Sequence, residues 1–110
     1  MTGNEYQKAA MRTCDLGLGP DDMLRHAVFE LNSEAGEVAG IMQKMYQGHS
    51  FDKMHMLKEL GDCLWGIAEA CTALGFTLEE VMQLNIDKLK ARYPEGFEPD
   101  KSINRAAGDI

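Results

Sequence analysis

The longest helical pattern in the sequence runs from about residue 21 to residue 46, directly after a proline. Hydrophobic side chains recur there at intervals of three and four residues, which places them on one face of an α-helix at about 100° per residue. These residues are Leu24, Ala27, Val28, Leu31, Ala35, Val38, Met42 and Met45. The stripe predicts a long amphipathic helix with one buried face, so that other helices have to pack along it.

The rest of the chain repeats this kind of pattern, and no segment predicts a strand. Asn4 is a candidate cap of a first helix, and Gly48 and Gly75 are placed to end two others. Thr77 and Glu80 have the spacing of a capping box. We therefore expect an all-α, four-helix bundle-like fold, with helices at about residues 4–14, 21–46, 52–74 and 77–93.

Length and composition suggest one small domain. We expect it to cover residues 1–97, with residues 98–110 as a tail that is extended or partly disordered because prolines and glycines interrupt it. A chain of 110 residues buries only about two-thirds of its unfolded surface. Its apolar content exceeds what four helices can hide, so we predict a homo-oligomer that completes the bundle.

Charge and cysteine content narrow the class of function. The 18 acidic residues exceed the 11 basic ones and give a net charge of -7, which argues against binding of a nucleic acid polymer. A small anionic ligand would need a bridging cation. The odd number of cysteines does not fit a disulfide framework. Neither a signal peptide nor a membrane span is visible, so we expect a cytoplasmic protein without a membrane partner.

Two pairs of acidic residues carry the clearest chemical signal. Glu34 and Glu37 lie three residues apart on the long helix, and Glu59 and Asp62 have the same spacing on the next one. Carboxylates on one helical face repel each other unless cations lie between them. No zinc motif and no Glu-x-x-His pair of a di-iron bundle is present. Oxygen ligands alone favour Mg²⁺, with Mn²⁺ as a substitute.

The third predicted helix has two unlike faces. Its main apolar stripe consists of Leu57, Leu60, Leu64, Ile67, Cys71 and Leu74. The nearly opposite face carries Glu59 and Asp62 and continues with Gly66, Ala70 and Ala73. Small residues at these positions predict a close approach by another chain or by a flat ligand.

The fourth predicted helix adds groups of opposite sign. Asn85, Lys88 and Arg92 share one strip of its surface, and the two cations suit phosphate oxygens. Mg²⁺ held by carboxylates is typical of enzymes that act on phosphate chains. The sequence has no Walker A loop, which excludes a P-loop enzyme.

The motifs "EAGE" and "KELGDCLW", followed by "TLEEVMQLNIDKLKARYPEGF", resemble the MazG-like all-α NTP pyrophosphohydrolases. The resemblance covers about Tyr6 to Phe97, and "RYPEGF" is similar to short single-domain members that are often associated with phages or mobile elements. It implies Mg²⁺ ligation by Glu34, Glu37, Glu59 and Asp62. It also implies hydrolysis of a nucleoside triphosphate to the monophosphate and diphosphate, for clean-up or control of nucleotide pools. A dimer or, as we favour, a dimer-of-dimers tetramer is implied as well.

The resemblance also suggests roles for individual residues. Glu34 is a candidate proton acceptor, and Lys88 and Arg92, with Asn85 nearby, are candidate triphosphate contacts. Independently of the resemblance, Gln7 and Trp65 are candidates for contact with the base, although a lone tryptophan is more often part of a core or an interface. Glu30 stands where many relatives have a small residue, and is either an outer-sphere carboxylate or, as we favour, a solvent-exposed residue.

Other functions remain open on the sequence. A dUTP or dCTP pyrophosphatase or a phosphoribosyl-ATP pyrophosphohydrolase would share the scaffold. A noncatalytic helical interaction module is a further alternative, although it leaves both acidic pairs unexplained. The base and sugar of the substrate and the number of metal ions do not follow from the sequence.

Overall fold

A computed structural model describes the whole chain, residues 1–110, and every regular element in it is a helix. An isolated bridge between Pro94 and Gly96 is the nearest approach to sheet structure. The all-α prediction is therefore confirmed. None of the helices is both long enough and apolar enough to span a membrane. The α-helices are α1 (Gly3–Ala10), α2 (Pro20–Tyr46), α3 (Lys53–Ala73), α4 (Leu78–Arg92) and α5 (Pro99–Ile103), and a 3-10 turn, η1, covers Met11–Thr13.

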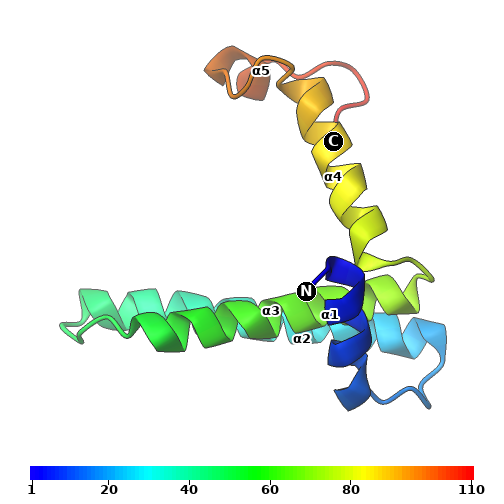
Figure 1. Cartoon of the computed structure of the whole chain (residues 1–110). Coiled ribbons are helices and arrows are strands. Elements are labelled where there is room, and N and C mark those ends of the chain that lie inside the picture. The colour runs from blue at the N-terminus through cyan, green and yellow to red at the C-terminus, as the bar shows by residue number, and fades with distance from the viewer. The chain divides into compact units, whose positions relative to one another are not determined.

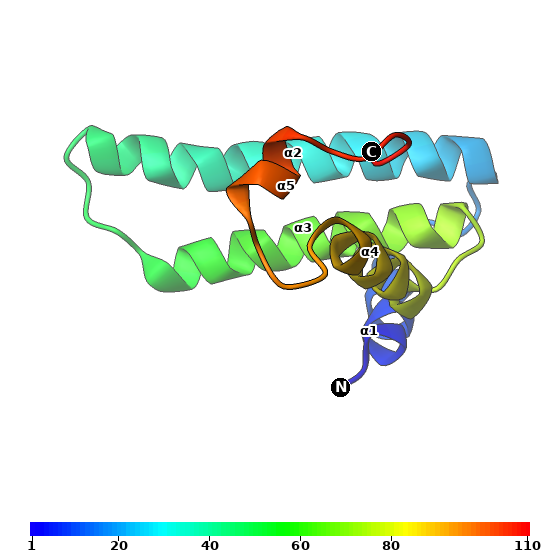
Figure 2. The same ribbon diagram turned by 90° about the horizontal axis from the view of Figure 1, so that it is seen from above.

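The long helices α2 and α3 lie side by side and run in opposite directions, as both Figure 1 and Figure 2 show. Gly48 has a positive φ of 95° just after α2, as expected for a glycine that ends a helix. The side chain of Asp52 then caps α3 by accepting a hydrogen bond from the backbone N–H of His55. This α2–α3 hairpin carries most of the residues that the sequence marked as functional.

The first helix differs from its prediction at both ends. Thr2, rather than Asn4, is the N-cap, because its hydroxyl accepts a hydrogen bond from the N–H of Glu5 at 3.1 Å. The α-helix stops at Ala10, four residues before Cys14, and continues as η1. The carbonyl of Ala10 accepts hydrogen bonds from two side chains, the Thr13 hydroxyl and the Trp65 indole. The backbone N–H of Cys14 donates a hydrogen bond to the carbonyl of Met11.

The chain divides into two compact units, Met1–Leu78 and Glu79–Ile110. This boundary lies within the segment that we expected to be one domain. The first unit holds the core, where α2 packs along α3 and α1 packs against α3. Its buried apolar residues are Met11, Met23, Ala27, Ile41, Ala68, Cys71 and Leu78.

The packing of α3 corrects our prediction for its two faces. Gly66, on the face of small residues, is buried, and a Cβ there would lie 3.2 Å from the backbone of Leu31. The close approach that we assigned to another chain or a ligand is thus made by α2 of the same chain. On the predicted main stripe, Leu57, Leu60 and Leu64 stay 51%, 45% and 47% exposed. Further along the same stripe Cys71 is buried, so periodicity identified both faces but not how far the chain itself covers each of them.

The second unit contains α4 and the C-terminal segment. The α4 helix ends at Arg92, as predicted from the proline that follows. The tail is not uniformly extended, because Pro99–Ile103 forms the short helix α5. Pro99 occupies the first position of this helix, where its fixed φ is already helical and its missing N–H is not needed.

Candidate active site

Three of the four predicted metal ligands come together on the α2–α3 hairpin. Glu34 reaches from α2, and Glu59 and Asp62 from α3, so that one oxygen of each carboxylate lies within 4.8 Å of the others. Glu34 and Glu59 are partly buried, whereas Asp62 is exposed. Three oxygen donors at this separation, with one side open, suit a hard divalent cation that keeps some of its waters.

The electrostatics of Glu34 show the effect of this crowding. Its pKa is raised to about 7, mainly through a hydrogen bond with Glu59 and through desolvation, with further contributions from Asp62 and Glu30. The carboxyl group of Glu34 therefore holds a proton where an isolated glutamate would be ionised. A bound cation would replace that proton and remove the repulsion. The donor set and its electrostatics thus fit the Mg²⁺ ion that the sequence predicted.

Glu37 and Glu30 are placed differently from expectation. Glu37 is exposed on α2 and lies outside the three-carboxylate group. Glu30, for which we favoured a solvent-exposed position, is only partly exposed, contributes to the raised pKa of Glu34 and lines a cleft beside the carboxylates. The alternative of an outer carboxylate beside the site therefore fits Glu30 better than full exposure, because it lies one helical turn before Glu34 and faces the same side of α2.

A cleft of about 300 Å³ lies beside the carboxylates. It is lined by Thr13, His26, Glu30, Glu34, Asp62 and Trp65. Three of these side chains are acidic, and two others, the imidazole of His26 and the indole of Trp65, are rings. The cleft has the composition of a site for a cation together with a polar organic ligand.

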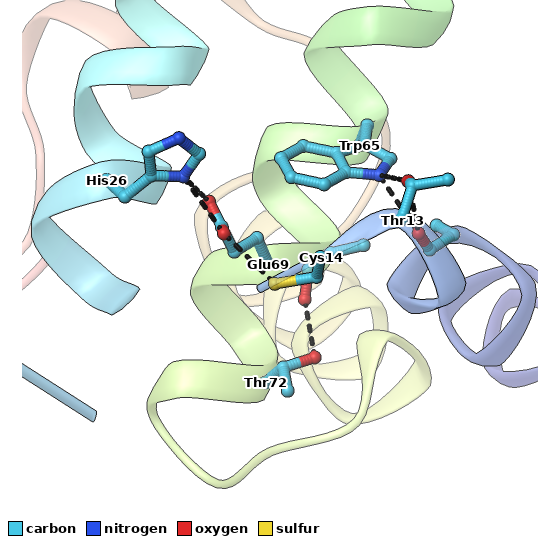
Figure 3. A network of polar contacts seen from close by, with 8 residues as sticks. Thr13, Cys14, His26, Trp65, Glu69 and Thr72 are labelled. Atoms are coloured by element: carbon cyan, nitrogen blue, oxygen red, sulfur yellow. Dashed lines mark hydrogen bonds and ion pairs between the residues drawn. The ribbon is translucent and has the colours of Figure 1, made fainter. Parts of the chain in front are cut away.

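Next to this cleft lies a buried carboxylate that the sequence did not reveal. Glu69 on α3 is only 1% exposed and is the one charged residue in the core. Its oxygens lie 2.7 and 3.0 Å from Nδ1 of His26 on α2, and the thiol of Cys14 donates a hydrogen bond to Oε2 at 3.1 Å. Figure 3 shows how the three side chains converge from different segments. The contact to Glu69 is the main cause that raises the pKa of His26.

Trp65 forms the wall of the cleft next to His26. Its indole N–H is shared between the carbonyl of Ala10 at 3.0 Å and the hydroxyl of Thr13 at 2.9 Å. Its ring meets the imidazole of His26 edge-on, with centroids 6.3 Å apart. Both polar contacts hold the indole in a fixed orientation, while part of the ring borders the cleft (Figure 3).

Gln7, the other candidate for base contact, uses its amide within the chain. Its Nε2 donates to the hydroxyl of Thr72 and to the carbonyl of Phe76, at 3.0 and 3.1 Å. Its Oε1 accepts a hydrogen bond from the N–H of Leu78 at 2.7 Å. Gln7 thereby ties α1 to the segment after α3, and a contact with a base would have to replace one of these bonds.

One further histidine supports the carboxylate group. Nε2 of His55 lies 3.1 Å from Oε1 of Glu59, one helical turn along α3. The contact fixes the orientation of a candidate ligand, as outer partners commonly do at metal sites. The spacing of four residues is visible in the sequence, but it does not belong to the Glu-x-x-His motif of di-iron sites, in which the histidine follows the glutamate by three residues.

The polar residues of α4 belong to the second unit. Asn85 and Lys88 are exposed. Arg92 forms a paired contact with Asp109, from Nε to Oδ2 and from Nη2 to Oδ1, both at 2.8 Å. Lys88 and Arg92 also line a second cleft, of about 580 Å³, between α4 and the C-terminal segment. In the sequence, Glu69 stands out only as the single acid within the apolar run "GIAEACTAL". No local sequence pattern indicates that Asp109 pairs with Arg92.

Comparison with known proteins identifies the family of the chain that carries this carboxylate site. Residues 24–97 match the MazG nucleotide pyrophosphohydrolase domain, a span that includes Glu34, Glu59 and Asp62 as well as the buried Glu69. The chain is also 30% identical to the Gene 37 protein of Mycobacterium phage L5 over 109 positions, which cover 91% of this chain and 96% of the phage protein. No solved structure gives a significant match. The chain belongs to the MazG nucleotide pyrophosphohydrolase family.

Proposed function

We propose that this chain is a Mg²⁺-dependent nucleoside triphosphate pyrophosphohydrolase. It would convert a ribo- or deoxyribonucleoside triphosphate and water into the monophosphate and diphosphate. The observation that carries the proposal is the convergence of Glu34, Glu59 and Asp62 from two helices at one edge of a cleft. Family membership supplies the reaction class, and the role would be clean-up or regulation of nucleotide pools.

In this proposal, Glu34, Glu59 and Asp62 hold the metal, and Glu37 joins them as a fourth ligand from the family pattern. When bound, Mg²⁺ would lower the pKa of the attacking water and neutralise charge on the phosphate chain. Mn²⁺ would serve as a substitute, because it accepts the same oxygen ligands. His55 would keep Glu59 oriented towards the site.

The remaining residues would bind and orient the substrate. Glu34 would accept the proton of the attacking water. Lys88 and Arg92, with Asn85, would stabilise the departing phosphates electrostatically. Trp65, which borders the cleft, would contact the base, with Gln7 as a second candidate.

We further propose that the protein acts as a homo-oligomer, with a tetramer favoured over a dimer. Support comes from the row Leu57, Leu60 and Leu64, which is about half exposed along the outer face of α3. An exposed apolar strip of this kind marks an interaction surface more often than a solvated one. Nucleoside triphosphates are cytoplasmic metabolites, and all three cysteines are free, so we place the enzyme in the cytoplasm.

A substrate screen tests the activity. All ribo- and deoxyribonucleoside triphosphates, together with phosphoribosyl-ATP, are incubated with the chain and Mg²⁺, and both monophosphate and diphosphate are quantified. We expect turnover of at least one triphosphate that stops when the metal is chelated. Preference for dUTP, dCTP or phosphoribosyl-ATP would assign one of the specialised activities. Absence of hydrolysis of every substrate would point to a noncatalytic interaction module.

Two substitutions test the site itself. Asp62→Asn and Glu59→Gln keep the shape of each side chain but remove its charge, and we expect kcat to fall about 100-fold or more, as for other groups that stabilise charge at a reacting centre. Glu37→Gln is the informative comparison, because Glu37 lies outside the three-carboxylate group. A comparable loss in that variant would establish Glu37 as a ligand, and wild-type kcat in Asp62→Asn would refute the site.

A further inference from the structure

The His26–Glu69 pair has no role in the reaction as proposed above, yet His26 lines the same cleft as Glu34 and Asp62. Glu69 is 1% exposed, and its polar contacts come from His26 and Cys14. A carboxylate buried to this degree is strongly unfavourable unless a positive group compensates it. The thiol of Cys14 is neutral, and burial together with Glu69 raises its pKa to about 11. The imidazole of His26 is the contacting group that can supply this positive charge.

The geometry also determines which nitrogen of His26 remains available. Nδ1 is occupied, because it lies within hydrogen-bond distance of both oxygens of Glu69. Nε2 makes no hydrogen bond within the chain, and in Figure 3 it lies on the side of the ring turned away from Glu69. The side chain of His26 is 51% exposed although its partner is buried. An imidazolium held in this way presents one N–H donor outward.

The charges around the cleft define what this donor can meet. The charged neighbours of His26 are Glu69 on α3, Glu30 on the same helix and Asp15 in the loop before it, and all are acidic. His26 is therefore the only side chain lining this cleft that can carry a positive charge. A charged donor binds best to an anionic oxygen, and neither Glu30 nor Asp15 is hydrogen-bonded to it.

We propose that His26 is a phosphate-binding residue, whose Nε2–H donates to a phosphoryl oxygen of the nucleotide, and that Glu69 is the residue that positions it. This inference rests on the proposed function for the identity of the ligand. It adds a cation to a site whose other lining charges are all negative. Trp65, edge-on to the imidazole and anchored by Ala10 and Thr13, limits the tilt of the ring.

The test uses a probe that contains the phosphate chain but no base, so that it does not depend on substrate preference. Binding of inorganic tripolyphosphate to the full chain is measured by calorimetry in the presence of Mg²⁺. We expect His26→Gln to weaken binding about tenfold or more, as for loss of a charge-assisted hydrogen bond. His49→Gln is the matched control, because His49 is exposed in the connection between α2 and α3, outside the cleft. Equal affinity of His26→Gln and wild type, or no binding by wild type, would overturn the inference.

A purely structural role for the pair makes a different prediction. Glu69→Gln removes the charge that keeps the imidazole protonated. We expect its tripolyphosphate affinity to approach that of wild type at pH 6 and to fall well below it at pH 8. If Glu69 served only packing, the ratio of the two affinities would be independent of pH. That result would contradict its positioning role.

A measurement on the wild-type chain covers the case in which a variant fails to fold. The imidazole nitrogens of His26 are followed by NMR as pH is varied, with and without Mg²⁺ and tripolyphosphate. Phosphate contact predicts a higher pKa of His26 in the complex, whereas an unchanged titration would refute the contact. Affinity for tripolyphosphate that depends on His26, without hydrolysis of any nucleotide, would support this inference while refuting the proposed function.

Discussion

The side-chain position of Gly66 on α3 faces the backbone of Leu31 on α2. A Cβ on residue 66 would lie 3.2 Å from both the N and the Cα of Leu31. The contact lies midway between the carboxylates at residues 59 and 62 and the buried acid at residue 69. It brings α2 and α3 close enough for Glu34 to reach Glu59 and for His26 to reach Glu69. The glycine that matters for the site is thus on α3, because a Cβ at Gly36 or Gly40 on α2 would meet nothing within 4 Å.

This contact predicts opposite effects for two glycine substitutions on one helix. Gly66→Ala has to push α2 away, which costs about 1–3 kcal/mol and outweighs the gain of about 1 kcal/mol in helix propensity. Gly61→Ala meets nothing within 4 Å and should realise the gain alone. We expect thermal unfolding to show a Tm about 5 °C below wild type for the first and a few degrees above it for the second. A stabilising Gly66→Ala would contradict the packing described here.

The carboxylate group predicts that the metal-free protein loses stability as pH rises. The pKa of Glu34 is about 7 in the folded chain, compared with 4.5 for a free glutamate, so folding favours its protonated form. This contribution is present in full below pH 4.5 and is lost as pH rises through about 7. His26 acts in the same direction, because its folded pKa is also raised. In the presence of a chelator, we expect Tm to fall by several degrees between pH 5 and pH 8.

Two comparisons isolate the part due to Glu34. Glu34→Gln is neutral at every pH, so its Tm should vary less with pH than that of wild type. Mg²⁺ should raise the wild-type Tm at pH 8 more than at pH 5, where protons compete with the metal for the carboxylates. Equal pH dependence in the two proteins, or no effect of saturating Mg²⁺ at pH 8, would contradict a metal site at Glu34.

The local features of this fold could be predicted from the sequence, and its long-range contacts could not. The 3.6-residue period located the helices, and the spacing of Glu59 and Asp62 placed both on one face of α3. Which face of α3 turns inward depends on competition between two apolar surfaces, and a helical period does not decide it. Glu69 is 43 residues from His26 and 55 from Cys14. No pattern along the chain records contacts of that separation.

The exposed leucines of α3 predict the outcome of an association experiment. We expect light scattering at micromolar concentration to give the mass of a tetramer, or at least of a dimer. Leu60→Asp places a charge in the middle of the exposed row and should shift the protein towards monomer. Lys58→Asp, on an exposed position two residues earlier in α3, is the matched control and should leave the mass unchanged. A monomeric wild-type chain would refute the oligomer.

The pairing of Arg92 with Asp109 predicts a gain of affinity on substitution of the tail. The guanidinium uses two N–H groups on the carboxylate of Asp109, and both side chains are largely buried, at 10% and 15% exposure. If Arg92 binds the triphosphate as proposed, the substrate has to displace Asp109, because the same planar fork serves carboxylate and phosphate. Asp109→Asn weakens that competitor. We therefore expect KM for the nucleotide to fall about 3- to 10-fold, the net value of about one ordinary hydrogen bond, with little change in kcat.

The matched control for this experiment is Asp100→Asn in the same tail. Asp100 accepts a hydrogen bond from Asn104 and does not contact Arg92, so its substitution should leave KM unchanged. Arg92→Lys completes the set, because an ammonium cannot reproduce the fork, and KM should rise. If KM is unchanged in both Asp109→Asn and Arg92→Lys, Arg92 does not bind the substrate. Its pairing with Asp109 then serves only to anchor the C-terminus to α4.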